Sequence, residues 1–231
     1  MNKYYFRARL LPTALTCVPL FILVHSVILK NYGDTLTSIL SILPILASTG
    51  ISFALVFLLT QVNRILSKEI FQRFYFKDEI NMPTTNYLLW SNGYYEPVIK
   101  EKLRLKIHSM YDIELHSPSD ETADEESSRK RIMVAVSQIR NNLRENPLLF
   151  QHNIEYGFFR NLLGGSVIAI IISISLALYA NSHDDKNLFF IGITMILVYA
   201  IPLLFSKKIL SIFGNNYAKI LFEQFLSIPK P

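Results

Sequence analysis

The residues of this 231-residue chain that could do chemistry are few and scattered. His108, His116 and His152 have no metal-ligand spacing with one another or with the single cysteine, Cys17. The sequence has no phosphate-cradling glycine loop, no G-x-S-x-G nucleophile elbow and no H-E-x-x-H zinc motif. These absences favour a non-enzyme without catalytic residues, cofactor or metal, while a membrane enzyme with dispersed catalytic residues stays open.

Four long apolar runs dominate the rest of the sequence. Each is close to the roughly 20 residues that a helix needs to cross the hydrocarbon layer, and no Asp, Glu, Lys or Arg interrupts any of them. They are Leu10–Leu29, Leu36–Thr60, Leu162–Ala180 and Leu188–Phe205. Only 18% of the residues are charged, against roughly 25% in soluble domains. We therefore predict an all-α, polytopic membrane protein with four transmembrane helices.

The net charge of +5 is unevenly distributed along the chain. The basic surplus lies in the two tails, whereas the central stretch 64–157 is nearly neutral. Because cytoplasmic segments of membrane proteins carry the excess of Lys and Arg, this pattern places both termini and the central stretch in the cytoplasm. The loops Asn31–Asp34 and Asn181–Lys186 then face the other side, and their shortness predicts two antiparallel hairpins. Topology accounts for the charge, so no nucleic-acid partner is expected.

The polar stretch between the hairpins predicts a helical cytoplasmic module. Pro97 suits the first turn of a helix, and Thr122-x-x-Glu125 has the form of a capping box for another. Two apolar stripes follow helical spacing, namely Ile99, Leu103, Ile107 and Met110, and then Ile132, Ala135, Val136, Ile139 and Leu143. The predicted parts are 1–60 (tail and hairpin 1), 61–157 (module), 158–206 (hairpin 2) and 207–231 (amphipathic tail). The tail is expected to lie against the membrane surface or the cytoplasmic helices.

Two features inside the spans could carry function. Small residues recur at every fourth position of the third span, at Gly165, Ala169, Ser173 and Ala177. Such a stripe lets helices approach closely, so it predicts either an oligomer or pore-lining face or packing within the chain. His25 is the one readily ionisable side chain within a span, and it is either a functional group such as a proton relay or an interfacial or bundle-packed histidine.

Two sequence motifs carry a resemblance to a known family. One is Pro83-Thr84-Thr85 followed by Leu88-Leu89. The other is Asn146-Pro147-Leu148-Leu149-Phe150, with Asn153-x-x-Tyr156-Gly157-Phe158-x-Arg160-Asn161-Leu162-x-Gly164 after it. Together they resemble a family of largely uncharacterised bacterial inner-membrane proteins with the same two-hairpin layout. The likeness extends from the first span to the third and departs in the acidic Ser117–Ser128 region. It implies the layout and a bacterial inner-membrane location, and it implies no activity.

The second motif marks the point where the chain returns to the membrane. Its polar and aromatic residues are a candidate juxtamembrane site: Asn153, Tyr156, Gly157, Phe158, Arg160 and Asn161. Arg160 can reach lipid phosphate or a helix C-terminus, and the asparagines can satisfy backbone groups. One interpretation is an anchor that sets the depth and rotation of the third span, and the other is an element that couples the cytoplasmic helices to a pore.

Three functional hypotheses follow. The first is a membrane-perturbing or pore-forming effector of the antiphage type, which self-associates and is controlled by a cytosolic protein or small molecule bound at 61–157. The second is a scaffold that anchors a cytosolic partner. The third, a small transporter or membrane enzyme, requires polar span residues to converge on one cavity. Those residues are Thr13, Thr16, His25, Ser38, Ser41, Ser173 and Ser175.

Overall fold

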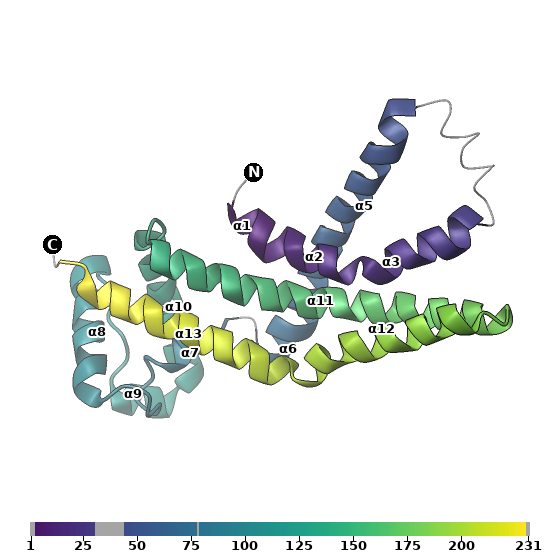
Figure 1. The fold of residues 1–231 in the computed structure, drawn as a ribbon. Helices are drawn as coiled ribbons and strands as arrows, with labels where there is room; N and C mark the ends of the chain where they lie inside the picture. The colour runs from purple at the N-terminus through teal and green to yellow at the C-terminus, as the bar shows by residue number, and fades with distance from the viewer. Residues whose placement is uncertain (1–2, 31–43, 78, 230–231) are drawn as a thin grey trace. The chain divides into compact units, whose positions relative to one another are not determined.

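The computed structural model describes residues 3–30, 44–77 and 79–229, and every regular element within these ranges is a helix (Figure 1). The predicted all-α class is therefore confirmed. The chain divides into two compact units, which we describe separately. Unit 1 comprises Met1–Phe71 and Gly157–Ser206, and unit 2 comprises Gln72–Tyr156 and Lys207–Pro231. The predicted module and the predicted C-terminal tail thus contribute to the same unit.

Unit 1 begins with a helical stretch that alternates between α and π geometry. Its segments are α1 (Lys3–Tyr5), η1 (Phe6–Leu10), α2 (Leu11–Thr16), α3 (Val18–Leu23) and η2 (Val24–Leu29). The parts before and after Cys17 meet at 41°. Pro12 and Pro19 lie in this stretch, and each removes a backbone N–H from the helical ladder, which accounts for the irregular geometry.

The remaining helices of unit 1 include the most apolar ones. They are α5 (Pro44–Leu66), η3 (Ser67–Gln72), the part of α11 (Pro147–Ser182) from Gly157 on, and α12 (Lys186–Leu204). Helices α11 and α12 are long and apolar enough to cross a membrane, and the bent first stretch is a third if it counts as one span. The second predicted span begins within 31–43, outside the described residues, and ends in α5. These helices are consistent with a membrane protein. The number of four spans stays a prediction.

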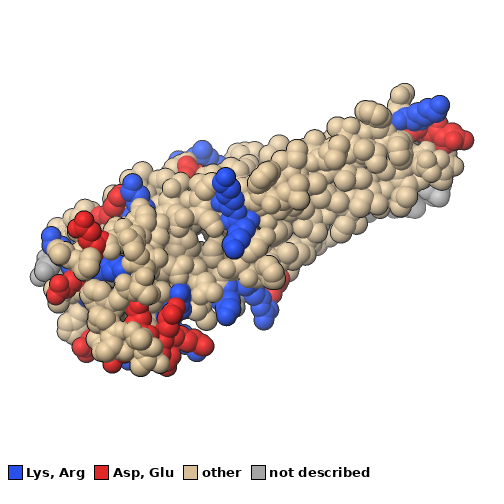
Figure 2. Space-filling model, turned by 90° about the horizontal axis from the view of Figure 1, so that it is seen from below, with Lys and Arg blue, Asp and Glu red and all other residues tan. Residues whose placement is uncertain are grey.

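Helix α11 contacts each of the other long helical stretches of unit 1. Near its start in this unit it meets the first stretch and α5, through contacts described below. Further along, Leu176 and Ala180 form a small core with Leu188 of α12, against Ile22 and Leu23 of the first stretch. Helix α12 is less enclosed, and Phe190 (75%) and Leu204 (79%) are largely exposed. Figure 2 shows the long surface of these helices free of charged side chains, as expected for helices in lipid.

Unit 2 is a small helical domain with one hydrophobic core. Its helices are α6 (Arg73–Phe76), α7 (Pro83–Asn86), α8 (Pro97–Tyr111), α9 (Pro118–Ala123), α10 (Glu125–Asn142), the first turns of α11, and α13 (Ser206–Ser227) from Lys207 on. Both predicted apolar stripes are confirmed. Leu103 and Ile107 of α8 and the whole α10 stripe are buried, with Ile99 and Met110 packed against them. Helix α13 completes this core with Leu221, Phe222 and Phe225.

The start of α10 differs from the sequence prediction. Thr122 is not its cap, because its hydroxyl donates to the Pro118 carbonyl inside α9. Asp124 caps α10 by accepting from the Ser127 N–H (3.0 Å). The capping box lies one helix earlier, where the side chains of Ser117 and Asp120 each accept from the other's backbone N–H. Two caps therefore lie close together in this region, one for α9 and one for α10, and the predicted Thr122 capping box is wrong.

Candidate functional site

The most informative contacts in unit 1 surround Asn161 of α11. Its Nδ2 donates to the Ala8 carbonyl (2.7 Å), and its Oδ1 accepts from the Ser67 hydroxyl (3.1 Å). Pro12, four residues after Ala8, has no N–H, so the Ala8 carbonyl lacks its α-helical donor. Asn161 is 1% exposed and supplies that donor. One side chain of α11 therefore joins the first helical stretch to η3 and satisfies a backbone group.

The carbonyl freed by the second proline of the first stretch, Pro19, also accepts a hydrogen bond from a side chain of another helix. Pro19 deprives the Leu15 carbonyl of its α-helical donor, and the Tyr199 hydroxyl of α12 donates to that carbonyl (2.7 Å). Tyr199 is buried. Membrane helices tolerate proline where neighbouring side chains satisfy the carbonyls that it frees. Both such carbonyls in the first stretch thus accept hydrogen bonds from helices of the predicted second hairpin.

Two adjacent glycines bring α11 close to α2 and α5. A Cβ on Gly164 would collide with the Asn63 carbonyl, and a Cβ on Gly165 would collide with the Thr16 hydroxyl. At this crossing the buried Asn63 Nδ2 donates to Thr13 Oγ1 (3.1 Å) and Thr16 Oγ1 (3.2 Å). The gap beside Thr16, Asn63 and Gly165 is too narrow for water. Asn63 and Asn161 therefore form two buried polar contacts between three helical stretches.

The predicted small-residue stripe is buried within the chain. Ala169 and Ser173 are fully buried, and the Ser173 hydroxyl donates to the Ala169 carbonyl (2.7 Å). Ala177 packs so closely against α12 that a Cβ on Gly192 would lie 3.0 Å from its Cβ. In the structure these small residues therefore pack against helices of the same chain.

The other juxtamembrane residues lie on α11 on both sides of the division between the units. In unit 2, Asn153 is half-buried, and the buried Tyr156 directs its hydroxyl at the Met82 sulfur (3.7 Å). In unit 1, Gly157 accommodates Tyr4, whose hydroxyl would lie 2.8 Å from an added Cβ. Phe158 contacts the edge of Phe159, and Arg160 is half-buried.

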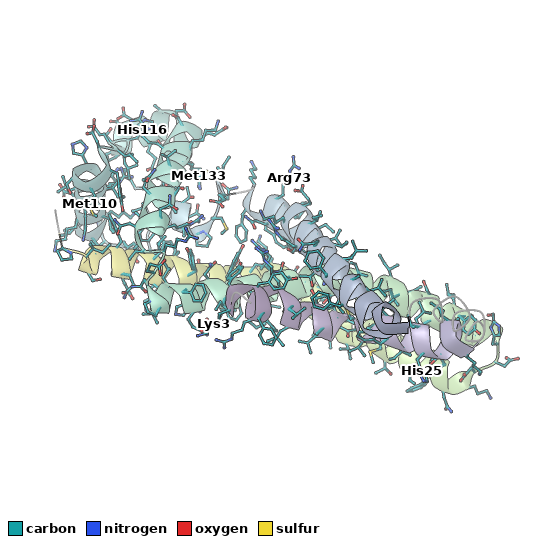
Figure 3. All side chains as sticks on the ribbon, turned by 90° about the horizontal axis from the view of Figure 1, so that it is seen from above. Lys3, His25, Arg73, Met110, His116 and Met133 are labelled. Atoms are coloured by element: carbon teal, nitrogen blue, oxygen red, sulfur yellow. The ribbon has the colours of Figure 1, made fainter. Side chains whose placement is uncertain are left out.

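His25 lies at the opposite end of the first stretch from Lys3 (Figure 3). It is exposed and lines an open cleft with Ser26, Lys30 and Asp185. The other described polar span residues predicted for a transporter do not line this cleft. Thr16 borders the narrow gap, Ser173 bonds within its own helix, and Ser175 is exposed. Ser38 and Ser41 lie outside the described residues. The described members of the set therefore line no common cavity.

Unit 2 holds a buried charge network that the sequence reasoning missed. The Glu121 carboxylate accepts from the backbone N–H groups of Trp90 and Ser91, both at 2.9 Å, and lies 3.6 Å from Arg104. Arg104 donates to the Leu88 carbonyl (2.6 Å) and stacks over the Trp90 ring at 4.4 Å. Burial lowers the pKa of Arg104 to about 10, so it stays charged at neutral pH. This network holds the segment after α7 against α8 and α9.

Two open clefts in unit 2 are large enough for a small ligand. One, of about 500 Å³, has a wall that combines the Trp90 indole with Arg104, Arg131, Glu101 and Asp120. His116, labelled in Figure 3, also lines it. The other, of about 460 Å³, lies beside Tyr94 and three asparagines. Among the described residues, no group of three or more His, Cys, Asp or Glu side chains could hold a metal ion.

Comparison with protein-family models, curated proteins and solved structures returns no match to this chain. Its function must therefore be argued from the geometry above. The sequence reasoning named Asn161 but missed its partner Ser67, and it missed Asn63 and Tyr199. The sequence does identify the acceptor in each proline contact, because a proline frees the carbonyl four residues earlier. It does not identify the side chain that donates to that carbonyl.

Proposed function

We propose that this chain is a non-enzymatic bacterial inner-membrane effector, in which a cytoplasmic helical module controls four transmembrane helices. In this proposal the spans form two antiparallel hairpins and both termini are cytoplasmic. A cytosolic protein or small molecule binds the module, in a cleft of the kind beside Trp90. Binding alters the packing of the spans and perturbs the membrane, as effectors of antiphage defence do.

The continuity of α11 is the observation that carries this proposal. One helix runs from Pro147 to Ser182. Leu149 near its start belongs to the core of unit 2, while Asn161 and Gly165 further along make the buried contacts of unit 1. Small shifts of a packed helix are a common means of switching, because buried contacts have discrete arrangements. A shift of the first turns of α11 would therefore strain the hydrogen bonds of Asn161.

The test is a membrane-potential assay in a bacterial host, using a potential-sensitive dye during induced expression. We expect the wild-type chain to depolarise cells and Asn161→Leu to do so at a lower expression level, because it loses both hydrogen bonds to the neighbouring helices. Ser175→Leu is the matched control, since Ser175 is exposed on the same helix and bonds only the Ile171 carbonyl. Unchanged potential with both the wild type and Asn161→Leu would contradict the proposal.

A specific observation favours the second candidate, a membrane scaffold. The small-residue stripe is buried against helices of the same chain, so in this structure it offers no surface through which protomers could assemble around a pore. A scaffold would purify as a monomer with a stoichiometric soluble partner and would leave the membrane potential unchanged. Measuring the mass of the purified complex beside the dye assay separates the two candidates.

A further inference from the structure

Basic residues of unit 1 gather around the Asn161 contact. Arg7 and Arg9 flank Ala8, and Arg160 precedes Asn161. Lys68 follows Ser67, whose hydroxyl bonds Asn161. Arg64 follows Asn63, whose carbonyl touches Gly164 one turn further along α11. Each of these five bases is next in sequence to a residue that takes part in the contacts of Asn161 or Gly164. Three helical stretches therefore bring five cations to one level along α11.

Little negative charge opposes these cations. Within 3–9, 60–71 and 157–161, the ranges that meet at this level, Glu69 is the one acidic residue. No carboxylate among the described residues pairs with Arg9, Arg64 or Lys68. The Arg9 guanidinium lies 5.4 Å from the centre of the Tyr4 ring, which restricts its motion. Arg7 and Lys68 are exposed, and Arg9, Arg64 and Arg160 are half-buried.

The cluster lies where the apolar surface begins. Leu162 and Leu10, the first residues of two predicted spans, follow Asn161 and Ala8 closely in the chain. Phe6 (42%), Leu11 (40%) and Ile65 (59%) are exposed next to the basic residues. Cations beside exposed apolar side chains match a ligand that has both a phosphate and hydrocarbon chains. Basic pockets between membrane helices bind such headgroups, and arginine forks suit phosphate oxygens.

We propose that the cluster of Arg7, Arg9, Arg64, Lys68 and Arg160 binds anionic phospholipids through the phosphates of their headgroups. The bound lipids hold the first stretch, η3 and α11 together at the level of the Asn161 contact. This site does not depend on the proposed function, because a scaffold would need the same anchorage.

The experiment is native mass spectrometry of the full chain released from nanodiscs of phosphatidylcholine with phosphatidylglycerol. We expect the wild type to retain phosphatidylglycerol in preference to phosphatidylcholine. Each base near an anionic surface is worth about fivefold in affinity, so Arg9→Gln with Lys68→Gln should lower the preference by about 25-fold. If the double variant does not fold, Arg64→Gln alone replaces it, and we expect this single change to lower the preference for phosphatidylglycerol about fivefold.

The matched control removes two charges at the other end of the unit, with Lys30→Gln and Lys186→Gln. Lys30 and Asp185 line one cleft, and Asp185 lies 24 residues beyond Asn161, across about 30 Å of helix. We expect this pair to keep the wild-type preference. Equal retention of both lipids by the wild type, or an equal loss in the control pair, would overturn the proposal. So would displacement of the lipid by millimolar inorganic phosphate, because the ligand would then be free phosphate.

Discussion

Asn161 and Tyr199 show how single polar side chains from other helices compensate for prolines in the first helical stretch. Each donates to a carbonyl that lies four residues before a proline, and each comes from a helix distant in sequence. A carbonyl left without a donor in hydrocarbon is costly, so these side chains have a structural role whatever the protein does. At the residue scale, the contacts around Pro12 and Pro19 are the parts of unit 1 most sensitive to substitution.

Tyr199→Phe tests the contribution of the Pro19 contact by removing a single oxygen atom. The variant keeps the ring and loses the hydrogen bond to the Leu15 carbonyl, so we expect a loss of about 1 kcal/mol in unfolding free energy. The measurement is unfolding of the purified chain in mixed micelles with increasing SDS. Thr194→Val is the control on the same helix, because Thr194 is exposed and bonds only the Phe190 carbonyl. Equal stability of Tyr199→Phe and the wild type would show that the hydrogen bond contributes nothing.

Gly165→Ala tests the close crossing of α11 and α2. The new Cβ would overlap the Thr16 hydroxyl and lie 2.7 Å from Asn63 Nδ2, so the helices must separate. We expect a loss of about 1–3 kcal/mol in the same SDS titration, the usual range for overpacking. Gly93→Ala should be nearly neutral, since an added Cβ there meets nothing within 4 Å. A neutral Gly165→Ala would mean that the crossing is looser than this structure has it.

Helix α13 depends on a lysine from α8. Lys106 is 3% exposed, and its ammonium donates to the carbonyls of Leu226 (3.1 Å) and Ile228, at the C-terminal end of α13. The last carbonyls of a helix have no intrahelical donor, and a cation there also suits the helix dipole.

Lys106→Met should therefore destabilise unit 2 by about 1–3 kcal/mol, because two part-buried carbonyls lose their charged donor. Fluorescence of Trp90, the single tryptophan, reports the unfolding of this unit during urea titration. Lys102→Met is the control, since Lys102 is exposed on the same helix. If both variants unfold at the wild-type urea concentration, the cap does not stabilise α13.

The core of unit 2 should also weaken at high pH. Burial, with the neighbouring Tyr94 as a smaller cause, raises the pKa of Tyr87 from 10.0 to about 12. The unfolded chain loses this proton near pH 10 while the folded chain keeps it, so stability is complete below pH 10 and falls between pH 10 and 12. Tyr87→Phe removes this titration, and we expect a smaller fall in the urea midpoint from pH 9 to pH 11. An equal fall in variant and wild type would assign the pH dependence to other groups.

At the scale of the whole molecule, the topology is the first property to measure. We expect a Cys17→Ser background with Asn187→Cys to react with a membrane-impermeant maleimide in intact cells, because the loop before α12 is predicted to face outward. Asn215→Cys on α13 should react only after the membrane is permeabilised. The reverse pattern would invert the proposed orientation and place unit 2 outside the cytoplasm.

Several properties could be predicted because they depend on short stretches of chain. Runs of about 20 apolar residues predicted membrane helices, and helical spacing predicted the stripes of α8 and α10, because both patterns are local. The positions of Pro12 and Pro19 are also local information, because each proline frees the carbonyl four residues earlier. The cap of α10 was missed because several acidic and hydroxyl residues near 117–125 suit a helix start equally well.

The partners of those features could not be predicted, because they are remote in sequence. Asn161 lies 153 residues from the Ala8 carbonyl and Tyr199 lies 184 residues from that of Leu15, so no periodicity connects them. The choice between an outward and an inward small-residue stripe also depended on which helices surround α11. The sequence alone was sufficient for a helical membrane protein with a helical module. How α11 binds the proline-bent first stretch, and how α13 completes the core, follow from packing between distant segments.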